Sequence, residues 1–243
     1  ALPRSRWAAM LEKSVRRGGG MPETVLAWQL GHAPHAARPA PAPSLVVLPE
    51  MGIAASHRRH GNAALKIFLM GNKAGAGHTH EDKGSFVIEL AGETLAFDPG
   101  TCDYSSPLAE IVKHCQRHSM LVPVGAPRRA HPASPLPADV KPECSGDERC
   151  FRARLVASPG WEGTYRRWVR TWDSPAPDTL VVRDDYELEP GAGTGVEWYW
   201  QTQVSVEVHD RAVTIRGERA SAELEVPAGC TVLATDLTPA MLR

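Results

Sequence analysis

After residue 44, hydrophobic and polar residues alternate in short runs that are separated by turn residues. In one such run Phe151 and Leu155 alternate with Arg152 and Arg154. Because successive strand residues point to opposite faces of a sheet, this period predicts half-buried β-strands. About ten to fourteen strands follow one another without crossover helices between them. The pattern therefore predicts a mainly β chain whose antiparallel, multi-stranded sheets pack as a β-sandwich.

The expected strands share this alternation and lie within residues 44–56, 64–70, 85–100, 150–158, 164–172, 179–188, 196–217 and 221–227. Turn residues at 91–93 and 209–211 predict the tips of two hairpins. One helix is expected to interrupt the strands, with Ser106 as its cap, Pro107 at its first position and an apolar face that extends to Cys115. Residues 126–146 are polar and rich in proline, which indicates a long loop.

The beginning of the chain has a different period. Trp7, Met10, Leu11 and Val15 are spaced as on one face of a helix, and a second short apolar run follows Pro22. We therefore expect three parts, which are terminal helices of an α-helical domain over 1–34, a Pro/Ala linker over 35–44 and the β-sandwich domain over 45–243.

Composition narrows the function classes. The 243 residues carry 27 basic and 28 acidic side chains, a net charge of -1, and no basic block. This balance argues against a nucleic-acid partner. No run approaches the roughly 20 apolar residues of a spanning helix, so no membrane span is expected. The five cysteines fit no metal spacing; Cys144 and Cys150 are close enough in sequence to bridge, although five free thiols are the simpler interpretation.

The chemistry is concentrated around His78-Thr79-His80. On an extended chain these two imidazoles point to the same face, which is a common start for a transition-metal site. The hairpin partner ends at Asp98, and His118 lies where the expected helix returns to a strand. His80, Asp98 and His118 make a two-imidazole, one-carboxylate set with an open position, which predicts one divalent metal ion, zinc above all.

A cupin barrel would be another fold that uses His-x-His. Cupins place a Glu a few residues after the second His and add a later Gly-rich His motif. Here Gly84, Ser85 and Phe86 follow instead, and no second motif appears.

The segment HTHEDKGSFVIELAGETLAFDPGTCDY, residues 78–104, resembles the signature of heparinase II/III-like polysaccharide lyases. That signature reads His-x-His-x-Asp-x-Gly-Ser-Phe, a Gly-Glu hairpin, Asp-Pro-Gly and a Tyr. Arg117 and His118 match the next block, with Ser119 where the family usually has Asn. The segment LPEMGIAAS resembles the entry strand, which leads to an Arg near Arg58 or Arg59. The resemblance covers roughly residues 45–125.

The resemblance implies a two-part enzyme, with an N-terminal α/α toroid and a C-terminal antiparallel β-sandwich that share one active site. It implies that His78 is catalytic and that His80, Asp98 and His118 hold the metal. Most of the toroid, which would carry the acid–base Tyr, is then missing from this chain. We therefore expect a C-terminal fragment that is inactive alone and acts in a periplasmic or secreted enzyme.

The implied reaction is β-elimination in a uronic-acid-containing polysaccharide, either heparin- or heparan-like or alginate-like. The imidazole of a histidine suits removal of the C5 proton, because its pKa of about 6.5 is close to working pH. Arg58, Arg59 and Arg117 are candidates to bind the acidic polysaccharide, since guanidinium groups pair with such anions bidentately. Tyr104 is a candidate to line the cleft. A non-catalytic carbohydrate-binding β-sandwich with a structural metal is the alternative.

Overall fold

A computed structural model describes residues 43–125, 136 and 138–237. The helices expected over 1–34, most of the linker expected over 35–44, and residues 126–135 and 137 of the long loop lie outside the described residues.

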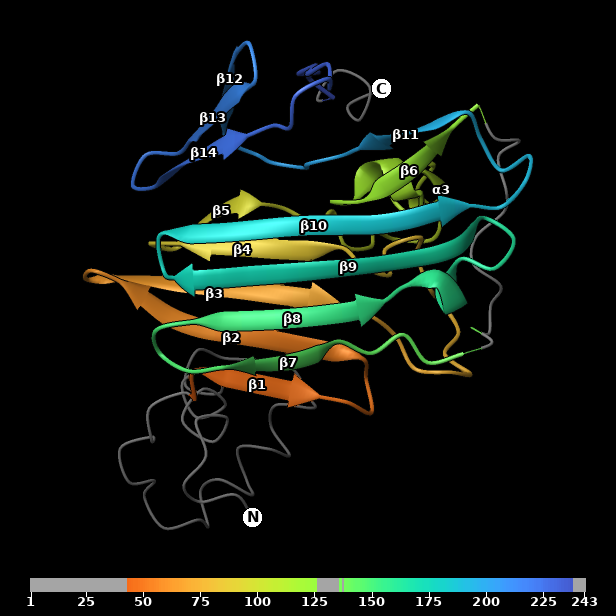
Figure 1. Ribbon diagram of the computed structural model, residues 1–243, viewed down its shortest axis with the longest axis horizontal. Helices are drawn as coiled ribbons and strands as arrows, with labels where there is room; N and C mark the ends of the chain where they lie inside the picture. Colours follow the sequence, from red (N-terminus) through yellow and green to blue (C-terminus); the bar gives the residue numbers. More distant parts are fainter. Residues whose placement is uncertain (1–42, 126–135, 137, 238–243) are drawn as a thin grey trace. The chain divides into compact units, whose positions relative to one another are not determined.

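Two large antiparallel sheets form the body of the sandwich (Figure 1). The first has its strands in chain order and consists of β1 (Leu45–Leu48), β2 (Ile53–His60), β3 (Ala63–Met70), β4 (Phe86–Leu90) and β5 (Glu93–Ala96). The second has the order β10-β9-β8-β7 and consists of β7 (Glu143–Gly146), β8 (Phe151–Val156), β9 (Tyr165–Ala176) and β10 (Thr179–Leu188). All neighbouring strands are antiparallel.

Two smaller sheets and three short helical segments complete the described fold. In the two-stranded sheet, β6 (Leu121–Val124) pairs with β11 (Gly195–Trp198). The three-stranded sheet consists of β12 (Ser205–His209), β13 (Ala212–Arg216) and β14 (Ser221–Glu225) in chain order. The helical segments are α3 (Leu108–Ile111) and the 3-10 helices η1 (Cys115–Arg117) and η2 (Ser158–Gly160). Within the described residues no helix is long and apolar enough to cross a membrane.

The inward side chains of both large sheets bury one shared apolar core. Its larger members include Ile67, Leu69, Phe86, Phe151, Trp168 and Trp172. Phe86 of the first sheet meets Trp172 of the second edge to face, with ring centroids 6.3 Å apart. Such aromatic pairs add to the hydrophobic stabilisation of a core. The expected mainly β sandwich is therefore confirmed.

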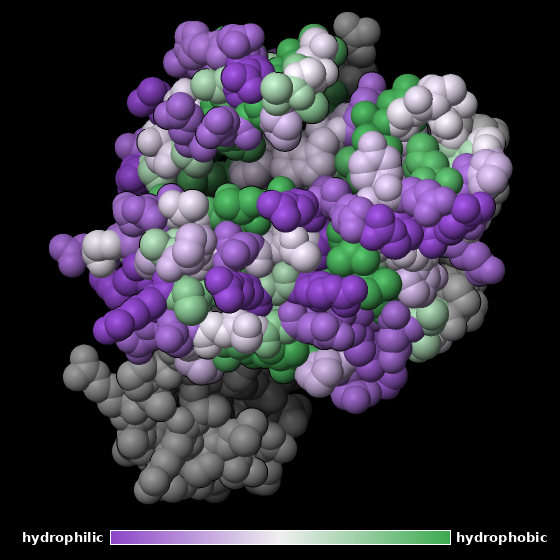
Figure 2. All heavy atoms as spheres, viewed as in Figure 1, coloured by the Kyte–Doolittle hydropathy of each residue, from purple (hydrophilic) through white to green (hydrophobic). Residues whose placement is uncertain are grey.

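The outer face of the second sheet is polar. Ion pairs join Arg152 to Asp173 at 3.1 Å and Arg166 to Glu187 at 2.7 Å across neighbouring strands. Figure 2 shows hydrophilic residues over much of this face. One sheet face is thus buried and the other solvated, which is the arrangement that alternation predicts.

The hairpins expected at 91–93 and 209–211 are present, as the turns between β4 and β5 and between β12 and β13. The inserted helix is shorter than expected, because α3 ends at Ile111 and Cys115 begins a separate 3-10 turn. The helix also begins one residue later than expected, at Leu108 after Pro107, although the Ser106 hydroxyl accepts a hydrogen bond from the Leu108 amide at 3.2 Å. Residues 143–146, which were expected to belong to a loop, form β7. All five cysteines are free, including Cys144 and Cys150.

Candidate functional site

Two segments of the site lie at one end of the first sheet. His78 and His80 lie between the end of β3 and the start of β4, and Asp98 follows the end of β5. Because β3, β4 and β5 run antiparallel to their neighbours, the end of β3, the start of β4 and the end of β5 lie at the same end of the sheet. Hydrogen bonds from the Gly84 amide to the Met70 carbonyl, 2.7 Å, and from the Met70 amide to Ser85, 3.0 Å, close the loop.

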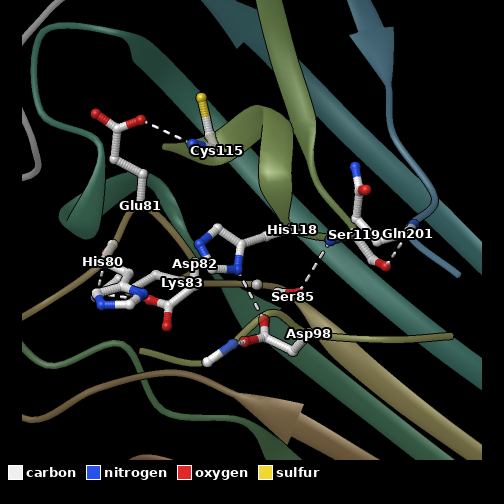
Figure 3. A network of polar contacts seen from close by, with 12 residues as sticks. His80, Glu81, Asp82, Lys83, Ser85, Asp98, Cys115, His118, Ser119 and Gln201 are labelled. Carbon is white, nitrogen blue, oxygen red and sulfur yellow. Dashed lines mark hydrogen bonds and ion pairs between the residues drawn. The ribbon is translucent and has the colours of Figure 1, made fainter. Parts of the chain in front are cut away.

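His118 and Asp98 form a buried pair. The imidazole Nδ1 lies 2.7 Å from the Asp98 carboxylate, and the two side chains are 0% and 13% exposed (Figure 3). The other Asp98 oxygen accepts a hydrogen bond from the Gly100 amide at 2.9 Å. A carboxylate partner fixes Nδ1 as the donor, and Nε2 of His118 is then buried with no hydrogen-bond partner in the described part of the chain.

Asp98 stays ionised in this environment. Burial alone would raise the pKa of its carboxyl, but the hydrogen bond and charge of His118, together with the Gly100 amide and His80, hold the pKa below its usual value. Hydrogen bonds and nearby positive charge favour the charged form of a carboxyl.

His80 lies beside this pair, with its ring centroid 5.7 Å from that of His118. Burial is the largest influence on its imidazole and lowers its pKa, which keeps the ring neutral at neutral pH. The buried ammonium of Lys83 donates to the His80 carbonyl and lies 2.7 Å from the Asp82 carboxylate. Lys83 therefore stabilises the backbone conformation at His80.

The donor types of this cluster fit a metal, but their present arrangement is incomplete. Two imidazoles and a carboxylate are ordinary zinc ligands, and Nε2 of His118, which has no hydrogen-bond partner among the described residues, is an atom that needs one. Among the described residues, however, no three His, Cys, Asp or Glu side chains already converge on one point. The Asp98 carboxylate instead occupies Nδ1 of His118.

His78 belongs to a separate, exposed pair. Its Nδ1 lies 3.1 Å from the hydroxyl of Tyr104, which is 67% exposed. The Lys113 ammonium lies 5.6 Å from the centre of the Tyr104 ring. His78 has a φ of 55°, a left-handed conformation that side chains rarely adopt. The His-x-His segment is thus not an extended strand, and the expectation that an extended backbone points its two imidazoles to the same face does not hold.

Arg58 and Arg59 do not join the site. They pair with Leu65 and Ala64 near the β2–β3 turn, whereas the His78 loop leaves β3 at its other end, after Met70. Six residues of strand separate these ends, about 20 Å. Arg58 is also buried, and its guanidinium donates to the Ser174 hydroxyl at 2.7 Å. The sheet register thus places both arginines at the end of the first sheet that is away from the histidines.

Arg117 is the candidate arginine that lies at the site. It precedes His118 at the end of η1 and is half-buried. Its side chain makes no hydrogen bond or ion pair with the described part of the chain.

The sequence reasoning missed the residues that support these loops. Glu81 is buried and accepts a hydrogen bond from the Cys115 amide at 2.8 Å, which ties the His80 loop to η1. Arg170 of β9 is fully buried and bonds to the backbone of both loops. Arg170 shares the inward face with Trp168 and Trp172, so its period-2 position was the signal available in the sequence.

Comparison with known proteins assigns the family of this antiparallel sandwich. Residues 40–235 match the family described as "Heparinase II/III-like, C-terminal". The chain belongs to this family. The search of curated proteins gives no significant match.

Solved structures agree with this fold. The chain is similar to one titled "Heparinase III-BT4657 gene product", at 12% identity and a TM-score of 0.56, with 87% of this chain and 33% of that chain covered. It is also similar to the heparan sulfate lyase HepC from Pedobacter heparinus, at 15% identity and a TM-score of 0.56, with 87% of this chain and 32% of that chain covered. The chain thus spans about a third of the length of these structures.

Proposed function

We propose that this chain is the C-terminal domain of a polysaccharide lyase that cleaves a uronic-acid-containing polysaccharide, heparin- or heparan-like or alginate-like, by β-elimination. Membership of the heparinase II/III-like family supports the lyase class. The observation that carries the proposal is the exposed His78–Tyr104 pair beside the buried His80, Asp98 and His118 cluster.

His78 is the proposed base. The C5 proton of a uronic acid lies alpha to a carboxylate and is weakly acidic, so its removal needs a base that is free near neutral pH. An imidazole meets this need, with an ordinary pKa of about 6.5. When Nδ1 of His78 donates to the Tyr104 oxygen, Nε2 is left free to take the proton. Tyr104 then orients the ring toward the solvent side of the site.

The departing sugar oxygen needs a proton donor on the other side of the bond. His78 fills one of these two roles, so we assign the second to a helical toroid domain of the same protein. The greater length of the similar solved structures supports a further domain. The 243-residue chain alone is then expected to be inactive, because positioning of reacting groups can supply roughly 7–11 kcal/mol of a barrier.

Arg117 is the proposed contact for the acidic groups of the substrate. It is adjacent to His118, half-buried and unpaired among the described residues. A planar guanidinium binds a carboxylate or sulfate through two parallel hydrogen bonds. Neutralising the substrate carboxylate makes the C5 proton easier to remove.

We also propose that His80, Asp98 and His118 hold one divalent metal ion, zinc before others. The neutral His80 ring, the ionised Asp98 and the unpartnered Nε2 of His118 support this donor set. Bound there, the ion would order the loop that carries His78. For all three side chains to bind the ion, the Asp98 carboxylate would have to give up its hydrogen bond to Nδ1 of His118 and bind the ion instead.

The test is the ultraviolet absorbance of the unsaturated uronate product, measured with the full-length protein on heparin, heparan sulfate and alginate. Product that forms with the wild type and not with His78→Ala supports the lyase. Binding of a uronan without product from the wild type would favour the alternative, a non-catalytic carbohydrate-binding sandwich with a structural metal.

A further inference from the structure

The buried guanidinium of Arg170 connects the second sheet to both loops of the site. Arg170 lies on β9 and is 0% exposed. Its Nη1 donates to the Gly84 carbonyl at 2.8 Å and to the Ser119 carbonyl at 2.8 Å. Gly84 closes the loop that carries His80, and Ser119 directly follows His118. One nitrogen atom therefore joins the two backbones that bear the clustered histidines.

Asp184 on β10 holds this guanidinium in place. Its carboxylate accepts Nε of Arg170 at 2.7 Å and Nη2 at 2.8 Å, a bidentate pair. The same carboxylate accepts the indole protons of Trp168 at 2.7 Å and Trp198 at 3.0 Å. A bidentate, fully bonded pair in a buried position has one geometry, so the Nη1 atom is fixed as well.

The loop also packs closely against the second sheet. Gly84 has a φ of 104°, and a Cβ atom built there would lie 3.3 Å from the Trp168 ring. The Trp161 indole donates to the Lys83 carbonyl at 3.1 Å from the same side. The two loops are joined directly as well, since the Ser119 amide donates to the Ser85 hydroxyl at 3.1 Å.

We propose that Arg170, oriented by Asp184, is a positioning residue that sets the spacing between His80 and the His118–Asp98 pair. It touches neither substrate nor metal and acts through the carbonyls of Gly84 and Ser119. This inference rests on the proposed metal site for its first readout and on the Asp98–His118 hydrogen bond alone for its second.

The test compares Arg170→Lys with Arg58→Lys. Both arginines are buried in the sandwich, but Arg58 bonds to Ser174 and the Arg149 carbonyl rather than to the site. The guanidinium of Arg170 makes four hydrogen bonds, two to Asp184 and one to each carbonyl, whereas a lysine ammonium has three donors on one atom and cannot form the bidentate pair with Asp184 together with both carbonyl bonds. The control removes a buried guanidinium of the same kind and therefore reports the general cost of such a change.

The first readout is zinc affinity, by competition with a chromophoric chelator. We expect Arg170→Lys to raise the Kd about 10–100-fold, as residues behind metal ligands do, and Arg58→Lys to leave it unchanged. The second readout is the Nδ1 proton of His118 in metal-free protein, by nitrogen-15 NMR. We expect this signal in the wild type and in Arg58→Lys, and its loss or a clear shift in Arg170→Lys.

A folded Arg170→Lys variant that keeps the wild-type His118 signal would overturn the positioning role, as would equal loss of zinc affinity in both variants. A wild type that binds no zinc would refute the metal site, and the NMR comparison would still decide the role of Arg170. If Arg170→Lys does not fold, Asp184→Asn replaces it, because the amide keeps one acceptor oxygen while weakening the ion pair.

Discussion

Two pairs of residues, His118 with Asp98 and His78 with Tyr104, lie at the same end of the sandwich and differ in burial. His118 is fully buried and bonded to Asp98, whereas His78 is bonded to Tyr104, which is 67% exposed. A buried, charge-assisted pair is rigid and closed to a polymer chain, while an exposed imidazole can meet one. This difference is the reason for proposing metal binding by the first pair and proton transfer by the second.

The largest effect expected is on catalysis by the exposed pair. His78→Ala removes the proposed base, and general acid–base groups contribute about 100- to 10,000-fold to a rate. The rate of unsaturated product formation by the full-length protein should fall by that factor. The melting temperature should stay at the wild-type value, because the side chain is exposed. A stable variant with wild-type turnover would remove His78 from the mechanism.

Next in size is the loss of the buried pair. His118→Ala leaves the ionised Asp98 without its main partner, and breaking a buried pair costs about 3 kcal/mol. Urea unfolding of the metal-free protein measures this loss. His209→Ala is the matched control, since its side chain is 72% exposed on β12 and should change stability by less than about 0.5 kcal/mol. Equal midpoints for both variants would show that the buried pair does not stabilise the fold.

A smaller effect is expected at the partner of the exposed histidine. Tyr104→Phe removes one hydrogen bond to His78, and such a bond contributes about 1 kcal/mol, which corresponds to roughly a fivefold loss in kcat/KM. Tyr186→Phe, an exposed tyrosine on β10, serves as the control and should have no effect. A loss above about 100-fold for Tyr104→Phe would make Tyr104 a proton carrier rather than an orienting group.

The smallest effect concerns acid stability. The pKa of Asp98 is lower in the folded protein than its ordinary value, so its ionised form stabilises the fold. This contribution is fully present above the unfolded pKa of about 3.9 and is lost as the pH falls through the folded value. Unfolding of metal-free protein at a series of pH values should therefore show a shallower acid loss for Asp98→Asn than for the wild type. Identical pH profiles would contradict the protective role of His118.

The strands were predictable where one face is buried and the other wet. Alternation in β8 and β9 agrees with their burial, and the turn at Ala91 joins β4 and β5 as expected. The strand β6 was not predicted, because it is four residues long and its partner β11 is about seventy residues away in the sequence. Short strands of this kind are defined by their pairing rather than by their own pattern.

The site was predictable as a set of residues and not as a geometry. The sequence predicted that Asp98 and His118 belong to one site, and their hydrogen bond agrees with that prediction. It also grouped Arg58 with the site, because a charged strand residue is normally exposed. Arg58 instead follows Ala54 and Ser56 on the inward face, where Ser174 satisfies it. The left-handed backbone conformation at His78 is a further feature that the residue pattern does not predict.

The proposal that His78 is a base and His80 a metal ligand is tested most directly by the zinc content of His78→Ala and His80→Ala, measured side by side on purified protein. We expect His78→Ala to retain the wild-type zinc content, because its ring is bonded to exposed Tyr104. His80→Ala should lose zinc, because its neutral ring lies against His118. Equal loss of zinc in the two variants would show that His78 is also a ligand and would contradict the separation of the two pairs.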